Sequence, residues 1–244
     1  MASIACIGDS MTSNISYNHV QTAYYPALLE GLLGTYLESI NARSKPRVRA
    51  SGVSGQTSTQ IAARKVCLTT FGVPEIGIIF CGVNDPGGGI SGATTKANLK
   101  TLAEQVLTAN AMARVIVCTI HYQNFASGGH NTGSPLVANA TPQDAPSLAL
   151  WTAASEAVTE EAVTYPDRIV LCDFYQYGYF NLVTGPNTFH GHSVGGTPAN
   201  VGVDTVWHEA VGDVHYNAVG QLMLANALYY TILNQTGWLA ALSA

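Results

Sequence analysis

A serine stands at the end of the first apolar run of the chain. The run "IACI" stops abruptly at Gly8-Asp9-Ser10. These three residue types are common in turns. A serine held at the carboxyl end of a strand can also act as a nucleophile when a neighbouring base takes its proton. The tripeptide fits both interpretations, and the choice depends on whether the rest of the chain supplies a base and hydrogen-bond donors.

Three later segments carry groups of that kind. "SGVSGQT" contains Gly55, whose backbone N–H can be approached closely, "GVND" contains the side-chain amide of Asn84, and "GDVHYN" contains the imidazole of His215. Histidine is the usual general base for a serine hydroxyl. The N–H groups of Ser10 and Gly55 and the amide of Asn84 can bind the oxyanion of a tetrahedral intermediate. Together these residues predict acyl transfer.

The elements that must position these groups follow from the apolar pattern. Five apolar runs are predicted to be strands, at residues 4–7, 48–50, 76–81, 115–120 and 169–172. Helical periodicity is found over about residues 25–40, 58–68, 94–110, 145–165 and 217–233. The runs "IGIIFCG" and "RVIVCTI" lack alternation, which indicates parallel strands covered on both faces. The order predicts a doubly wound α/β domain, in which ligands bind at the carboxyl ends of the strands.

The four polar segments resemble the blocks of a known superfamily. "IGDSMT", "SGVSGQTS", "GVND" and "DVHYNAVG" occur in the order typical of the SGNH hydrolases, also called GDSL esterases, and extend to Gly220. The resemblance implies a flavodoxin-like three-layer α/β/α sandwich with a central, mainly parallel five-stranded sheet. It also implies hydrolysis of esters, often of acyl or acetyl groups on sugars or lipids. The catalytic serine and histidine of that family correspond to Ser10 and His215.

The acid of the expected triad departs from the family pattern. The family places it three residues before the histidine, where this chain has Gly212, and the nearest acid is Asp213. Three alternatives stay open. Asp213 reaches the ring through a bulged loop, Glu209 or Asp204 takes its place, or a backbone carbonyl orients the histidine in a Ser–His dyad. Of these, we predict Asp213 as the acid of the triad.

Residues 175–207 fit no regular period and are rich in glycine and aromatic side chains. Because long irregular segments in compact domains are usually functional, we interpret this one as an insertion over the active-site face of a single domain spanning residues 1–244. His121, His208 and Tyr177 are predicted substrate-binding residues. The aromatic residues of the insertion can equally pack it onto the domain, and His208 can compete for the role of base.

The amino-acid composition excludes some classes of binding partner. The net charge is −5 and no run of Lys or Arg occurs, so the basic surface of a nucleic-acid binder is not expected. No apolar stretch approaches the ~20 residues that span a bilayer, and no signal peptide is expected at the start. Charged residues make up 10% of the chain, against roughly 25% in typical domains. Such a composition is more frequent in secreted or particle-associated proteins.

The five cysteines show no metal-binding or redox spacing. We therefore expect reduced, buried thiols, no metal and no cofactor. The sequence as a whole predicts a serine esterase that hydrolyses short-chain, acetyl-type esters of a small molecule or a glycan through an acyl-enzyme. The alternatives are a lipase or thioesterase for longer acyl chains, or a non-catalytic carbohydrate-binding module on the same fold. The oligomeric state and the compartment do not follow from the sequence.

Overall fold

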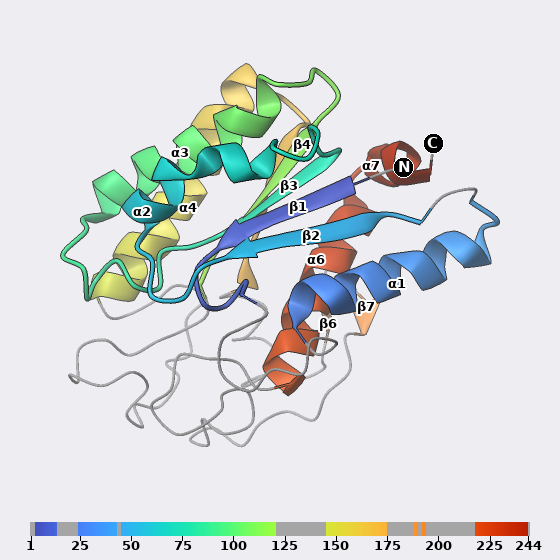
Figure 1. Cartoon of the computed structure of the whole chain (residues 1–244), viewed down its shortest axis with the longest axis horizontal. Coiled ribbons are helices and arrows are strands. Elements are labelled where there is room, and N and C mark those ends of the chain that lie inside the picture. The colour runs from blue at the N-terminus through green and yellow to red at the C-terminus, as the bar shows by residue number, and fades with distance from the viewer. Residues whose placement is uncertain are drawn as a thin grey trace.

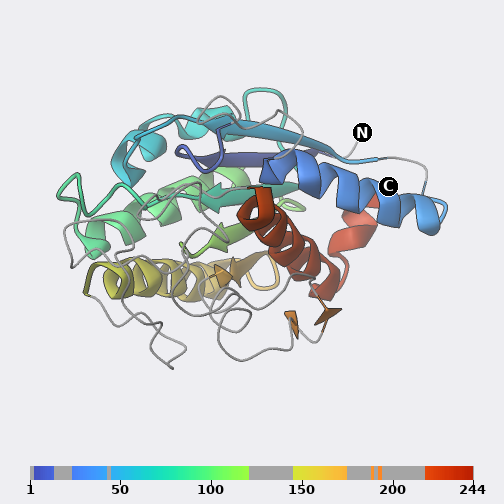
Figure 2. The same ribbon diagram turned by 90° about the horizontal axis from the view of Figure 1, so that it is seen from below.

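A central sheet of parallel strands organises the chain (Figure 1). The computed structural model describes residues 3–13, 24–42, 45–120, 145–174, 188–189, 192–193 and 218–243. The five strands are β1 (Ser3–Gly8), β2 (Arg47–Gly52), β3 (Ile76–Phe80), β4 (Arg114–Cys118) and β5 (Ile169–Cys172), in the order β2-β1-β3-β4-β5. All neighbouring pairs are parallel. Figure 2 shows from below that β2 forms one edge of the sheet.

Helices cover both faces of this sheet. They are α1 (Tyr25–Ser39), α2 (Ser58–Ala63), the 3-10 helix η1 (Lys65–Leu68), α3 (Gly92–Leu107), α4 (Ala145–Thr164), α6 (Ala218–Asn234) and α7 (Trp238–Ser243). In Figure 1, α2, α3 and α4 lie on one side of the strands, and α1 and α6 lie on the other. This is the expected three-layer α/β/α sandwich.

The core explains why the strand sequences lack alternation. Successive side chains of a strand point to opposite faces, and both faces here are buried. Cys6 and Ile78 belong to the cluster beneath α1 and α6, whereas Ile7 and Ile79 belong to the cluster beneath α2, α3 and α4. Two helix layers therefore select apolar residues at every position of the central strands.

The cysteines fit the expected role as buried small side chains. All five are free thiols, and four of them are buried. Burial is the main cause that raises the pKa of the Cys6 thiol to about 12. A thiol with so high a pKa stays protonated and is a poor nucleophile at neutral pH.

Two helical details differ from the sequence-based prediction. The helix expected over residues 58–68 is divided at Arg64 into α2 and η1. Helix α7 was missed because it is short and buries only Trp238 and Leu242, too few residues to produce a visible period. The sheet, expected to be mainly parallel, is wholly parallel in its five strands.

Part of the predicted insertion can be placed. Strands β6 (Thr188–Phe189) and β7 (His192–Ser193) form a short antiparallel pair within it. The rest of residues 175–207 lies outside the described residues. Among the helices that the structure describes, none is long and apolar enough to cross a membrane.

Candidate active site

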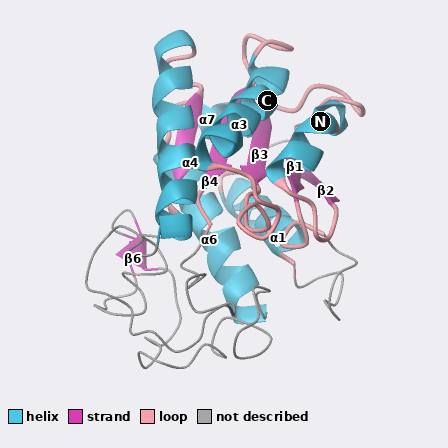
Figure 3. Ribbon diagram, turned by 90° about the vertical axis from the view of Figure 1, so that its left-hand side faces the viewer, coloured by secondary structure: helices cyan, strands magenta, loops and turns pink. Residues whose placement is uncertain are grey.

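The sheet has a topological switch point between β1 and β3. The chain passes from β1 to β2 on one side of β1 and then returns to build β3 on its other side. In open α/β sheets, ligands bind in the crevice at such a point, outside the carboxyl ends of the strands. Ser10 follows β1 and Asn84 follows β3, so two predicted site residues flank the switch point. Figure 3 views the molecule from the side toward which the strands end, with loops gathered in front of them.

The turn that carries Ser10 is tight and buried. The N–H of Thr12 donates to the carbonyl of Asp9 at 3.2 Å, and the N–H of Ser13 donates to the carbonyl of Ser10 at 3.2 Å. The side chain of Thr12 is hydrogen-bonded to the hydroxyl of Tyr25 over 3.1 Å. Ser10 is only 3% exposed. The serine is thus held by its backbone on a fixed turn at the end of β1.

Two glycines allow this turn to fold back over the sheet. A Cβ at Gly8 would lie 2.2 Å from Oγ1 of Thr12 and 2.3 Å from the carbonyl oxygen of Phe80. A Cβ at Gly52 would lie 2.2 Å from the backbone nitrogen of Ser13. Both contacts are far below van der Waals distance. Glycine is therefore required at the ends of β1 and β2 for the serine turn to take this path.

Asp9 stabilises the turn. Its Oδ1 accepts a hydrogen bond from the N–H of Met11 at 3.0 Å, a local bond typical of aspartate in a turn. Burial raises the pKa of the Asp9 carboxyl to about 7, with a further rise caused by Asp85, while the Met11 N–H and Arg64 act in the opposite direction.

The loop after β2 presents Gly55 next to the loop of Asn84. The N–H of Gln56 donates to the carbonyl of Val53, closing a turn in which Gly55 has a φ of +75°. Nδ2 of Asn84 donates to the carbonyl of Gln56 at 3.0 Å. A side-chain amide carries two N–H donors, and this bond occupies one of them. The predicted oxyanion-hole residues Gly55 and Asn84 are therefore joined through Gln56.

Asp85, which directly follows Asn84, is a structural residue. It is fully buried. Its Oδ1 accepts from the N–H of Ser58 at 2.7 Å, and its Oδ2 accepts from the hydroxyl of Thr95 at 2.5 Å. The carboxylate thus ties the first turns of α2 and α3 to the loop that carries Asn84.

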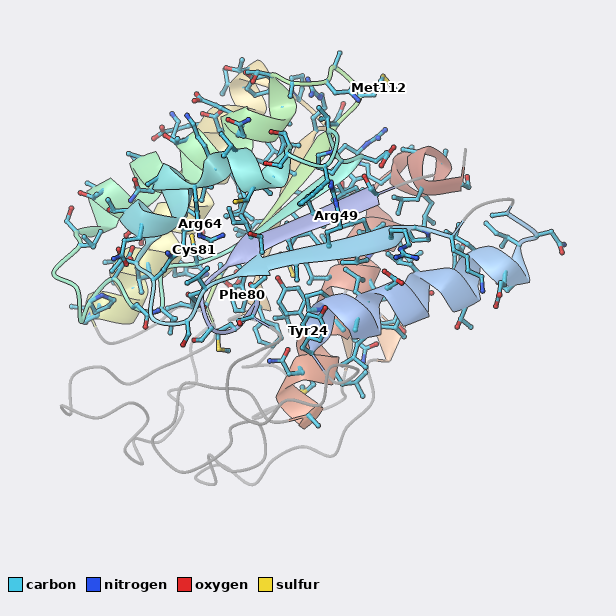
Figure 4. The ribbon with its side chains drawn as sticks, in the orientation of Figure 1. Tyr24, Arg49, Arg64, Phe80, Cys81 and Met112 are labelled. Atoms are coloured by element: carbon cyan, nitrogen blue, oxygen red, sulfur yellow. The ribbon has the colours of Figure 1, made fainter. Side chains whose placement is uncertain are left out.

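Sequence reasoning missed Arg64, whose guanidinium donates to the carboxyl ends of β1 and β2 and to Gln56 in the loop after β2. The available signal was an arginine nine residues after Gly55, at the end of a partly apolar helix, in a chain with only ten basic residues. Arg64 lies where α2 meets the carboxyl ends of the strands (Figure 4).

The remaining predicted site residues lie outside the described part of the chain. They are His215, Asp213, Glu209, Asp204, His121, His208 and Tyr177. Their roles stay predictions. Helix α6 begins at Ala218, three residues after His215.

The fold is a doubly wound α/β domain with polar loops at the carboxyl edge of a parallel sheet. The sequence model of the GDSL-like lipase/acylhydrolase family matches residues 6–222. The chain belongs to this family of ester hydrolases. A comparison with curated protein sequences finds no match.

Solved structures agree with this fold. A lipase/acylhydrolase from Enterococcus faecalis has a TM-score of 0.61 at 19% identity, with 95% of each chain covered. A member of the lipolytic G-D-S-L family from Veillonella parvula has a TM-score of 0.63 at 14% identity, covering 96% of this chain and 100% of that one. Axe2, an acetylxylan esterase from Geobacillus stearothermophilus, has a TM-score of 0.61 at 16% identity, covering 94% and 93%.

Proposed function

We propose that this protein is a serine esterase that removes short acyl groups, of the acetyl type, from a carbohydrate ester. The observation that carries the proposal is the arrangement at the switch point. Ser10 stands on a tight, buried turn after β1, and the loops of Gly55 and Asn84, which follow β2 and β3 on either side of β1, are hydrogen-bonded to each other. Acyl transfer needs a nucleophile and oxyanion donors on a rigid frame, and these loops offer both.

In the proposed mechanism, Oγ of Ser10 attacks the ester carbonyl while His215 takes the hydroxyl proton. The negative charge that develops on the carbonyl oxygen is bound by the N–H groups of Ser10 and Gly55 and by the amide of Asn84. Collapse of the tetrahedral intermediate breaks the ester C–O bond, and His215 returns the proton to the leaving alcohol. Water then attacks the acyl-enzyme with His215 again as base, which releases the acid and restores Ser10.

The substrate class is inferred from composition and from similar folds. The chain carries few charges, and the segment over residues 175–207 is rich in Tyr, Asn and Gly, which favours a polar substrate with a short acyl group. Two of the similar structures are acetylxylan esterases. His121, His208 and Tyr177 are the proposed substrate contacts. Polar and aromatic side chains of these types suit the hydroxyls and apolar faces of a sugar ring.

The function is tested by hydrolysis of p-nitrophenyl esters from acetate to decanoate, beside an acetylated xylan. We expect turnover of acetate that falls as the acyl chain lengthens, and a loss of about 10³-fold or more in Ser10→Ala and His215→Ala. Highest activity on the long esters would favour the lipase or thioesterase alternative. Equal inactivity of the wild type and Ser10→Ala on every substrate would indicate the non-catalytic carbohydrate-binding module.

The acid of the triad is resolved in the same assay. Because a carboxylate orients the histidine and stabilises the imidazolium, we expect Asp213→Asn to reduce kcat strongly and Glu209→Gln to leave it near wild type. The two variants remove one charge each from the same segment and so control for each other. Full activity of Asp213→Asn would remove Asp213 from the mechanism.

A further inference from the structure

Arg64 makes four hydrogen bonds at the edge of the candidate site. Its Nη2 donates to the carbonyl of Gly8 at 2.6 Å. Its Nη1 donates to the carbonyl and to Oγ of Ser51, at 2.8 and 2.9 Å. Its Nε donates to Oε1 of Gln56 at 2.6 Å. All three nitrogens of the guanidinium are therefore engaged.

The acceptors lie at or next to the loops that carry the proposed catalytic groups: Gly8 ends β1, Ser51 lies near the end of β2, and Gln56 lies in the loop after β2. The carbonyl of Gly8 lies two residues before Ser10 and also accepts from the N–H of Val53 at 3.2 Å. Gln56 directly follows Gly55, and its own carbonyl accepts the amide of Asn84. One side chain thus connects the serine turn, the glycine loop and, through Gln56, the asparagine loop.

The arrangement of these acceptors requires the side chain of arginine and would not be matched by that of lysine. A guanidinium is planar and offers five N–H donors in a fixed fork, whereas a lysine ammonium is a single point with three donors on a flexible stem. Lysine at this position can reach one acceptor group but cannot join Gly8, Ser51 and Gln56 at once. Figure 4 shows Arg64 near the end of α2 and close to Cys81, and the side chain is half-buried.

We propose that Arg64 is a positioning residue that holds the N–H of Gly55 and the amide of Asn84 in register with Ser10, and thereby sets how well the oxyanion is stabilised. This inference rests on the proposed function. Arg64 acts through the backbone and side chains of its partners and does not touch the reacting atoms. Small displacements of preorganised donors lower the rate because stabilisation in the transition state depends on their distance to the oxyanion.

The test compares Arg64→Lys with Arg168→Lys. Arg168 is a matched control, because its guanidinium also donates to three backbone carbonyls, those of Leu107, Asn110 and Ala113. Arg168 directly precedes β5 and so lies at the amino end of the sheet, opposite the site. With p-nitrophenyl acetate we expect Arg64→Lys to lower kcat by about 10- to 100-fold with KM within about threefold of wild type. Arg168→Lys is expected to lower the Tm while kcat stays unchanged.

A second readout separates positioning from general stability. Guanidinium at millimolar concentration is expected to restore part of the kcat of Arg64→Ala, whereas methylammonium is not, because only the planar ion reproduces the fork. If the Arg64 variants do not fold, Gln56→Met serves instead. This variant removes a single acceptor of Arg64 and is expected to lower kcat about three- to tenfold.

Several results would overturn the inference. They are wild-type kcat in folded Arg64→Lys or in Gln56→Met, a rise in KM alone, or an equal loss of kcat in Arg168→Lys. An active wild type with unaffected Arg64 variants contradicts this inference only. A wild type that hydrolyses no ester contradicts the proposed function, and the role of Arg64 with it.

Discussion

The Asp9 carboxyl is the buried acid closest in sequence to the proposed nucleophile. It is 1% exposed and near neutrality it is divided between its charged and neutral forms, because burial raises its pKa to about 7. The negative charge of Asp85 raises this pKa further, whereas the hydrogen bond from the N–H of Met11 and the positive charge of Arg64 lower it. The serine turn is therefore built around an acid whose charge is costly to bury.

This arrangement predicts how stability depends on pH. Between the ordinary pKa of 3.8 and the folded value of about 7, the folded protein holds a proton on Asp9 that the unfolded chain has released. The protonated Asp9 therefore contributes to the free energy of unfolding, by at most on the order of 4 kcal/mol. This contribution is fully present below pH 3.8 and is lost as the pH rises through 7.

We expect Asp9→Asn, which can still accept from Met11, to remove this dependence. The measurement is the free energy of unfolding in urea for both proteins from pH 4 to pH 8. The difference between the two proteins isolates Asp9 from all other titrating groups. A difference that stays constant over this range would contradict the raised pKa.

At the scale of elements, the site depends on how α2 and α3 are attached to the loop after β3. Asp85 accepts from the first residue of α2 and from Thr95 in the first turn of α3. Asn98 of α3 also donates to the hydroxyl of Ser58 at 2.9 Å. Two helix starts and the Asn84 loop thus meet at one buried carboxylate, whose hydrogen bonds add to the backbone hydrogen bonds of the loop itself.

Removing that carboxylate is expected to be costly. Asp85→Ala leaves the N–H of Ser58 and the hydroxyl of Thr95 without this acceptor, and we expect a loss of about 2–4 kcal/mol in the free energy of unfolding. Thr95→Val, which removes one of the two donors, is the smaller control change at about 1 kcal/mol. Chemical denaturation measures both. An Asp85→Ala protein within 0.5 kcal/mol of wild type would show that the carboxylate is not the attachment point.

Across the whole molecule, the sheet and its layers could be predicted from the sequence because the strands are buried on both faces. Runs such as "IGIIFCG" leave little ambiguity, and the order of strands and helices determines a doubly wound sheet. The place of Asp9 in a turn was also predictable, since its hydrogen bond with the N–H of Met11 depends on local chain chemistry.

What could not be predicted depends on contacts between segments distant in sequence. Arg64 reaches Gly8 across 56 residues, and Asp85 reaches Ser58 across 27. No periodicity or propensity encodes which carbonyl a guanidinium will meet in the folded state. His215 was assigned from its residue type and from the family resemblance, and Asp213 from its place next to it; both lie outside the described residues, so they are proposals for experiment.

The central claim is that Ser10 is the nucleophile of an acyl-transfer site. The most direct measurement is reaction of the native protein with a fluorophosphonate, followed by intact-mass and peptide mass spectrometry. We predict one adduct per chain, located on Ser10, absent in Ser10→Ala and formed much more slowly in His215→Ala. A wild-type protein that forms no adduct, or one labelled elsewhere while Ser10 stays unmodified, would contradict the claim.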